Sequence, residues 1–199
     1  GIPLEVEGLW FHYPNQPYLY RDLNFHINAK ERFLVVGENG VGKSTLLKLM
    51  MGIQTPDRGN IRFHPNTDVA YYAQELEQLD LQKTVLENVS AQGCTMKQLR
   101  SVLSNFLFYE DDINKKAEVL SPGEKARIAL CRILLQKANF LILDEPTNHL
   151  DPETQEVIGR NFRRFEGTIM VVSHNRRFVE QIGINRVLRL PSGRVEDYH

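Results

Sequence analysis

Cysteine, long apolar runs and an excess of either charge are all scarce in this chain of 199 residues. The two cysteines, Cys94 and Cys131, lie far apart and form no Cys-x-x-Cys pair, so neither a disulfide framework nor a structural zinc site is indicated. The longest unbroken apolar run is Val69–Ala73, which is far too short for a transmembrane helix. Lys and Arg number 24 against 25 Asp and Glu, which excludes the basic excess of a dedicated nucleic-acid-binding protein.

The remaining composition fits one globular domain. Apolar residues make up 42% and charged residues 25%, and the length is that of an ordinary single domain. No secretory signal opens the sequence, which predicts a cytoplasmic location. Because the first residue is Gly rather than Met, we expect residues 1–199 to be one domain cut from a longer protein.

Short apolar strands alternate with helices, mainly in the second half of the chain. A helix is predicted at Ser44–Met51, and residues 82–118 are predicted to be helical with Thr84 and Thr95 as N-caps. Two more helix starts, each a capping side chain followed by proline, are Ser121-Pro122 and Asp151-Pro152, and another helix is expected near Phe178. Strands are expected at 4–8, 23–27, 33–36, 61–63, 69–72, 140–143, 168–172 and 187–190. The pattern predicts an α/β fold with a parallel sheet covered on both faces.

A phosphate-binding loop follows the expected strand at 33–36. The sequence Gly37-Glu38-Asn39-Gly40-Val41-Gly42-Lys43-Ser44 fits G-x-x-x-x-G-K-[ST] and lies between a strand and a helix. Glycines let the backbone turn its N–H groups toward phosphate oxygens at the positive end of a helix dipole. Lys43 is expected to reach the β- and γ-phosphates, and the Ser44 hydroxyl to bind Mg²⁺. The predicted contacts are Gly37, Asn39, Gly40, Val41, Gly42, Lys43, Ser44 and Thr45, and the loop indicates a nucleoside triphosphatase.

Two carboxylates end the expected strand at 140–143. Asp144, at the end of the strand, is placed to hold Mg²⁺ through water, and Glu145, one residue further, to polarise an attacking water molecule. The plainer alternative is a buried strand that ends in solvated acids.

The order of further motifs resembles the ATP-binding cassette (ABC) family. Leu120-Ser121-Pro122-Gly123-Glu124 is similar to the family signature Leu-Ser-Gly-Gly-Gln, and the other landmarks occur in the family's order over essentially the whole chain. The resemblance implies an ABC-type nucleotide-binding domain with a mixed parallel core sheet, an N-terminal antiparallel β-subdomain and a small helical subdomain at about residues 75–135. It implies ATP and Mg²⁺ as cofactors.

The resemblance also assigns roles to single residues. Tyr13 would stack on adenine, Gln74 would contact Mg²⁺ and the lytic water, and His174 would bridge the γ-phosphate and Glu145. A half-buried strand aromatic and a solvated loop glutamine remain the alternatives for Tyr13 and Gln74. The expected site comprises the catalytic residues Glu145, His174 and Gln74, the metal ligands Ser44, Gln74 and Asp144, and the nucleotide contacts Tyr13, Ser121, Gly123, Glu124 and Asp151 beside the phosphate loop.

In the family, the signature helix faces the ATP that is bound by a second nucleotide-binding domain. The resemblance therefore implies two domains head to tail, in one longer chain or as a homodimer with ATP, and slow hydrolysis by a single copy. Pro122 departs from the family's glycine and removes one backbone donor, although proline suits a first helical position. This leaves open the effect of Pro122 on hydrolysis.

Two further segments resemble the F-type branch, whose members join two cassettes without a membrane domain and act on ribosomes. These are Glu145-Pro146-Thr147-Asn148-His149-Leu150-Asp151 and Ser121-Pro122-Gly123-Glu124-Lys125-Ala126-Arg127. Residues 172–176 are also close to the branch pattern Val-Ser-His-Asp-Arg, with Asn175 in place of Asp. The ribosome, with its RNA, is therefore the expected partner, in translation or in antibiotic resistance.

Two alternatives from other classes remain. One is the ATPase subunit of a membrane transporter, partnered by a membrane domain, although the segment 75–120 is short for docking one. The other is a nucleotide-gated module with negligible hydrolysis, suggested by Pro122. A local run of arginines could contact RNA phosphates or could be a solvated helix face: Arg160, Arg163, Arg164, Arg176 and Arg177, opposed within residues 159–177 only by Glu166.

Overall fold

The structure is a computed structural model that describes residues 1–73, 77–90 and 93–199. The N-terminal part forms an antiparallel sheet in the order β2-β1-β4, with β1 Leu4–Phe11, β2 Tyr20–Ile27 and β4 Arg58–Phe63. The expected alternation in β1 shifts at Gly8, which has a φ of 58°, so Leu9 is the next buried residue after Val6. Glycine adopts this left-handed conformation without the steric cost of a Cβ.

The second sheet has six strands in the order β5-β6-β7-β3-β8-β9. The strands are β3 Arg32–Val36, β5 Val69–Ala73, β6 Phe140–Asp144, β7 Thr168–Val172, β8 Arg186–Arg189 and β9 Arg194–Asp197. All pairs are parallel except β8 with β9, which form an antiparallel hairpin. The predicted α/β fold, with a mixed parallel sheet and an N-terminal antiparallel sheet, is confirmed.

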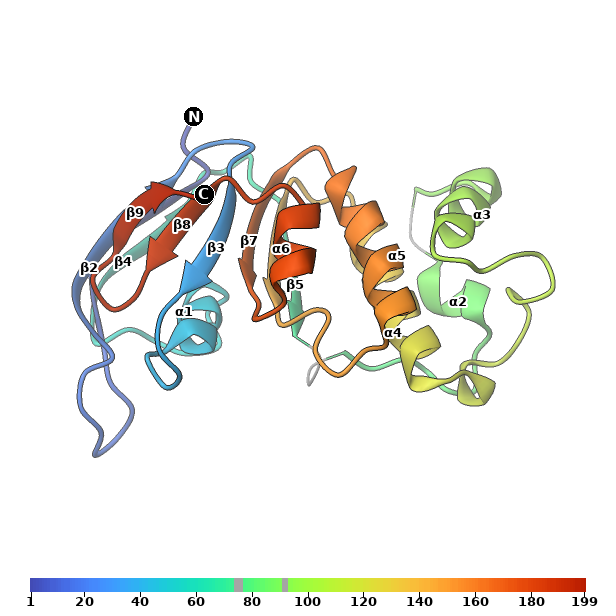
Figure 1. Cartoon of the computed structure of the whole chain (residues 1–199), viewed down its shortest axis with the longest axis horizontal. Helices are drawn as coiled ribbons and strands as arrows, with labels where there is room; N and C mark the ends of the chain where they lie inside the picture. Colours follow the sequence, from blue (N-terminus) through green and yellow to red (C-terminus); the bar gives the residue numbers. More distant parts are fainter. Residues whose placement is uncertain (74–76, 91–92) are drawn as a thin grey trace.

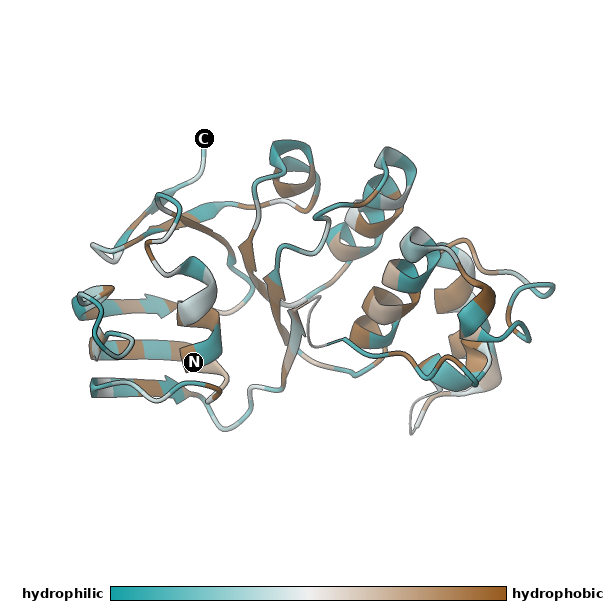
Figure 2. Cartoon of the chain, turned by 90° about the horizontal axis from the view of Figure 1, so that it is seen from below, coloured by the Kyte–Doolittle hydropathy of each residue, from teal (hydrophilic) through white to brown (hydrophobic). Residues whose placement is uncertain are grey.

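Apolar layers cover both faces of this sheet, because its strands carry apolar residues at successive positions. In β6, Phe140 and Ile142 join the core shared with α1 and the antiparallel sheet, whereas Leu141 and Leu143 join the core beneath α4, α5 and α6. Figure 2 shows the hydrophobic colour gathered on these central strands. Two cores, one on each face, thus keep the sheet rigid.

The helices are α1 Lys43–Met50, α2 Val85–Val89, α3 Met96–Asn105, α4 Pro122–Leu134, α5 Pro152–Arg163 and α6 Arg176–Gln181, with a 3₁₀ turn η2 at Ala117–Val119. Figure 1 shows α1 on the side of the antiparallel sheet and α4, α5 and α6 on the other side. α2 and α3 lie at the far end, beyond α4. Among the described residues, no helix is long and apolar enough to cross a membrane.

The prediction of helix throughout 82–118 is wrong for residues 82–84, 90, 93–95 and 106–116 of the described chain. Thr84 and Thr95 do form capping boxes at α2 and α3, but α3 ends at Asn105 with Phe106 as its C-cap, and Leu107 has a φ of 68°. A left-handed residue cannot continue a right-handed helix. The chain then turns back so that Lys116 pairs with Thr84.

Candidate functional site

The carboxyl ends of three neighbouring strands meet at one edge of the parallel sheet. The order β6-β7-β3 places Asp144 and Glu145, His174, and the phosphate loop side by side, although the sequence separates them widely. Ligands of parallel α/β sheets bind outside this edge, at a point where the strand order reverses. β3 occupies such a point, between β7 and β8.

A cavity of about 940 Å³ opens at this edge. Its lining contains the phosphate loop from Asn39 to Thr45 together with Tyr13, Glu145 and His174. Sequence reasoning missed the other lining residues, which are Gln16, Pro17, Tyr18, Leu19, Val172 and Pro191. Val172 is the last residue of β7, two residues before His174 in the chain, and the others reach the cavity through the packing of residues 16–19 and of the segment after β8 against the loop.

The N-terminus of α1 is left open toward this cavity. Among the α-helices of the described residues, α2 to α6 each have an N-cap side chain, from Thr84, Thr95, Ser121, Asp151 and Asn175. α1 instead begins after Gly42, which has a φ of 95° and makes no capping bond through a side chain. The first N–H groups of α1 therefore remain available for an anion.

Contacts within the chain hold the loop in shape. A Cβ on Gly42 would lie 2.8 Å from the Tyr20 hydroxyl, which donates a hydrogen bond to the Gly42 carbonyl. Burial raises the pKa of Tyr20, so the hydroxyl stays protonated and keeps this role. Lys43 Nζ donates to the Gly37 carbonyl at 2.8 Å, which holds its charge over the loop.

Ser44 and Asp144 form an all-oxygen pair beside the loop. Ser44 Oγ donates to Asp144 Oδ1 at 3.0 Å. Hydroxyl and carboxylate oxygens suit Mg²⁺, which takes few protein ligands and keeps water and phosphate oxygens as the rest. The residues present therefore fit the ion, and a second hollow of about 470 Å³ between Ser44, Asp144 and Glu145 leaves room for its water.

Glu145 and His174 contact each other at the rim of the cavity. His174 Nε2 lies 3.2 Å from Glu145 Oε1, and the His174 backbone N–H donates to Glu145 Oε2 at 3.4 Å. Glu145 has a φ of 48°, a costly conformation for a non-glycine residue, which its N–H bond to the Val172 carbonyl at 2.7 Å helps to hold. The carboxylate is thus aimed by backbone contacts, and it can polarise a water molecule there.

Tyr13 lies in the cavity wall as expected of a base-stacking ring. Its hydroxyl lies 3.0 Å from Thr45 Oγ1, and its ring packs edge-on against Phe11 with centroids 5.0 Å apart. Gln74 lies outside the described residues, so its predicted metal and catalytic roles stay predictions.

The signature residues lie elsewhere, at the start of α4. Ser121 and Glu124 form a capping box, with Glu124 N donating to Ser121 Oγ at 3.2 Å and Ser121 N donating to Glu124 Oε1 at 3.0 Å. Pro122 is the first helical residue, as predicted. Asp151 caps α5 by accepting from the N–H and hydroxyl of Thr154, and these bonds lower the pKa of Asp151. The cavity lining contains none of Ser121, Gly123, Glu124 and Asp151, so their nucleotide contacts stay predictions.

Two of the five clustered arginines pair with acidic residues that lie outside the segment 159–177 and were therefore not considered in the sequence analysis. Arg176 pairs with Glu180 and Arg177 pairs with Glu156, each at 3.1 Å. Folding brings Glu156 across from α5. The basic surface is therefore weaker than its sequence indicates.

Comparison with known proteins agrees with this geometry. The family described as "ABC transporter" matches residues 20–148. The chain belongs to this family. The cassette is an ABC ATPase domain, which binds ATP with Mg²⁺ and hydrolyses it.

Its relatives place the cassette near the F-type members. It is 45% identical to the "Putative ATP-binding protein YdiF" of Bacillus subtilis over 98% of the chain, and 39% identical to the "ABC transporter F family member 5" of Arabidopsis thaliana over 90%. The cassette spans only 30% and 26% of those two proteins. Among solved structures, the ATP-binding cassette MJ0796, a dimer bound to ADP and Pi, shares the fold with a TM-score of 0.76, 22% identity and coverage of 98% of this chain and 99% of its own.

Proposed function

We propose that this cassette belongs to an F-type ABC protein in which ATP drives the closure of two cassettes, and that this closure is coupled to action on the ribosome. The F-type names among the relatives and the two F-type sequence segments support the proposal. The cassette covers less than a third of each of these two relatives, so each has room for a second cassette. The proposed location is the cytoplasm, where ribosomes work.

The observation that carries the pairing is the separation of two half-sites on one chain. The cavity holds the phosphate loop, Glu145 and His174, whereas the signature helix α4 begins outside the cavity lining. The helix start keeps the Ser121 hydroxyl hydrogen and the Gly123 N–H available for a phosphate, even though Pro122 has no N–H. Two cassettes placed head to tail would each complete the other's nucleotide site.

Ribosome co-sedimentation tests the coupling. The full two-cassette protein with Glu145→Gln, in ATP and Mg²⁺, is expected to pellet with ribosomes at low salt and to be released as the salt concentration rises. Its matched control is the same protein with Lys43→Ala added, which should stay in the supernatant because it cannot close on ATP. Equal pelleting of both proteins, or of neither, would contradict ATP-gated ribosome binding.

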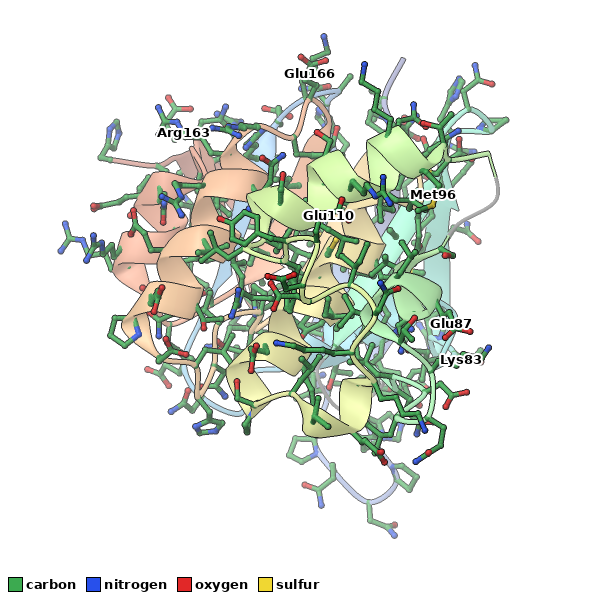
Figure 3. The ribbon with its side chains drawn as sticks, turned by 90° about the vertical axis from the view of Figure 1, so that its right-hand side faces the viewer. Lys83, Glu87, Met96, Glu110, Arg163 and Glu166 are labelled. Atoms are coloured by element: carbon green, nitrogen blue, oxygen red, sulfur yellow. The ribbon has the colours of Figure 1, made fainter. Side chains whose placement is uncertain are left out.

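The transporter subunit remains the second candidate, because the helical end exposes large apolar side chains. Leu81, Met96, Tyr109 and Val119 are each more than two-fifths exposed. Figure 3 views this end, with Met96 at the upper right, Glu110 nearer the centre, and Glu87 and Lys83 together lower on the right. A gene that encodes one cassette next to a membrane-domain gene would support the transporter, whereas a gene that encodes two cassettes joined by a linker would support the ribosome proposal.

A further inference from the structure

Asn175 is the residue at which the chain departs from the Asp of the F-type pattern, and its amide makes three contacts. Its Oδ1 accepts from the Phe178 backbone N–H at 3.0 Å and so caps α6. Its Nδ2 donates to Gln155 Oε1 at 2.8 Å and lies 3.4 Å from Thr147 Oγ1. The backbone donor at Phe178 requires an oxygen, which fixes the amide orientation and turns the NH₂ group toward Gln155.

Gln155 carries the connection on to the loop before α5. Its Nε2 donates to the Leu150 carbonyl at 2.8 Å, so its orientation is fixed by a backbone acceptor as well. Leu150 precedes Asp151, and Asp151 lies so close to α4 that a Cβ on Gly123 would be 2.9 Å from Asp151 Oδ1. α6, α5 and α4 stand side by side in Figure 1.

Only an amide at both positions satisfies this chain of contacts. An aspartate at 175 could still cap α6, but it would set a carboxylate oxygen against Gln155 Oε1. Turning the Gln155 amide would repair that contact and would place its oxygen against the Leu150 carbonyl. Either arrangement loses one hydrogen bond in a half-buried network, so the NH₂ group of Asn175 has a role that the cap alone does not explain.

We propose that Asn175 and Gln155 are positioning residues that join the His174 loop of one nucleotide site to the start of the signature helix α4. His174 immediately precedes Asn175, so a shift of His174 on meeting the γ-phosphate moves the amide that holds Gln155 and Leu150. The segment 150–151 then changes its packing on Gly123. The use of α4 by a second nucleotide rests on the proposed function, whereas the link within the chain does not.

Amide hydrogen exchange in the single chain tests the link. Two variants, Asn175→Asp and Asn175→Ser, keep an oxygen that can cap α6 and lose the NH₂ group that donates to Gln155; the serine hydroxyl sits on a side chain too short to replace it. The matched control is Asn185→Asp, because the Asn185 side chain also accepts a backbone N–H, that of Arg32, and is exposed. ATP affinity is measured on all four proteins by calorimetry.

In the wild type and in Asn185→Asp, ATP with Mg²⁺ is expected to slow exchange at residues 150–155 and at 121–125. In both Asn175 variants this nucleotide-dependent slowing at 121–125 should fall about fivefold, the effect of roughly one lost hydrogen bond, while ATP affinity changes less than twofold. Slowing that persists in both variants would overturn the proposal, as would its loss in the Asp variant alone, which would point to the added charge. The proposed head-to-tail dimer is tested separately, by measuring ATP-dependent dimerisation of the wild type. If no dimer forms, the exchange experiment still tests the link within the chain.

Discussion

At the scale of single residues, the nucleotide site depends on charges that the fold holds still. Lys43 is fixed by the Gly37 carbonyl, Ser44 by Asp144, and Glu145 by two contacts with His174. Groups held in place in this way lose less freedom when ATP binds, which favours both affinity and catalysis.

Lys43→Ala is expected to abolish ATP binding and to leave the fold intact. The change removes the cation aimed at the β- and γ-phosphates and one hydrogen bond to a loop carbonyl, but no core packing. Calorimetry on the folded variant is the measurement, with Lys97→Ala, an exposed lysine on α3, as the control that should bind ATP normally. Unchanged affinity in Lys43→Ala would contradict the assignment of the phosphate loop.

Glu145→Gln should keep ATP binding and lose turnover by roughly 10²–10⁴-fold, because the amide preserves the shape but cannot polarise water as a carboxylate does. One of the two contacts with His174 should survive, since the amide oxygen can face either Nε2 or the backbone N–H. Phosphate release by the full two-cassette protein measures the effect. Turnover close to wild type would show that Glu145 is not the base.

At the scale of elements, caps and close approaches set where the helices lie. The start of α1 has no side-chain cap and faces the cavity, whereas α2, α3 and α4 each begin with a capping box. The starts of α4 and α5 meet at Gly123 and Asp151. The contact between Gly123 and Asp151 sets the direction of the signature helix α4.

Gly123→Ala is expected to destabilise the cassette. Alanine improves helix propensity by about 1 kcal/mol, but its Cβ would lie 2.9 Å from Asp151 Oδ1 and 3.0 Å from Thr154 Oγ1, and overpacking costs roughly 1–3 kcal/mol. We therefore expect a net loss in the free energy of unfolding, measured by urea denaturation. Lys125→Ala on the same helix is the control and should be neutral; a stabilised Gly123→Ala protein would show that α4 and α5 are free to separate.

The Asp151 cap predicts a pH dependence. The bonds from Thr154 lower the pKa of Asp151 in the folded state, so their stabilisation is present above the unfolded pKa of about 3.9 and is lost as the pH falls through the folded pKa. The variant Asp151→Asn has no group that can titrate at this position. As the pH falls from 5 through the folded-state pKa of Asp151, the variant should therefore lose less stability than the wild type, measured by thermal unfolding. Parallel curves for the two proteins would mean that the bond does not depend on charge.

At the scale of the whole molecule, the nucleotide cavity and the signature helix lie apart within the described residues. Figure 1 shows why: α1 and α4 lie on opposite sides of the parallel sheet. A rigid sheet with a core on each face keeps them apart, so completion of the site is expected from a second cassette and not from folding of the first.

The apo chain is therefore expected to be a monomer at micromolar concentration, and Glu145→Gln with ATP and Mg²⁺ to shift it toward a head-to-tail dimer. Pro122→Gly should change dimer affinity less than tenfold, because the regained N–H contributes about 1 kcal/mol and the looser helix start costs about the same. Analytical ultracentrifugation measures both. A fully dimeric apo protein, or a dimer lost in Pro122→Gly, would contradict the role of α4 as the contact to a second ATP.

The sequence by itself determined the phosphate loop, the Asp144–Glu145 pair and the starts of α2 to α5, because each is encoded within a few neighbouring residues whose chemistry is local. Only the tertiary structure decided where α3 ends, that Glu156 pairs with Arg177 of the arginine cluster, and that residues 16–19 line the cavity. It also joined Asn175 to Gln155 and Gly123 to Asp151. Such contacts depend on how elements distant in the chain pack against one sheet, and no local pattern of residues records that packing.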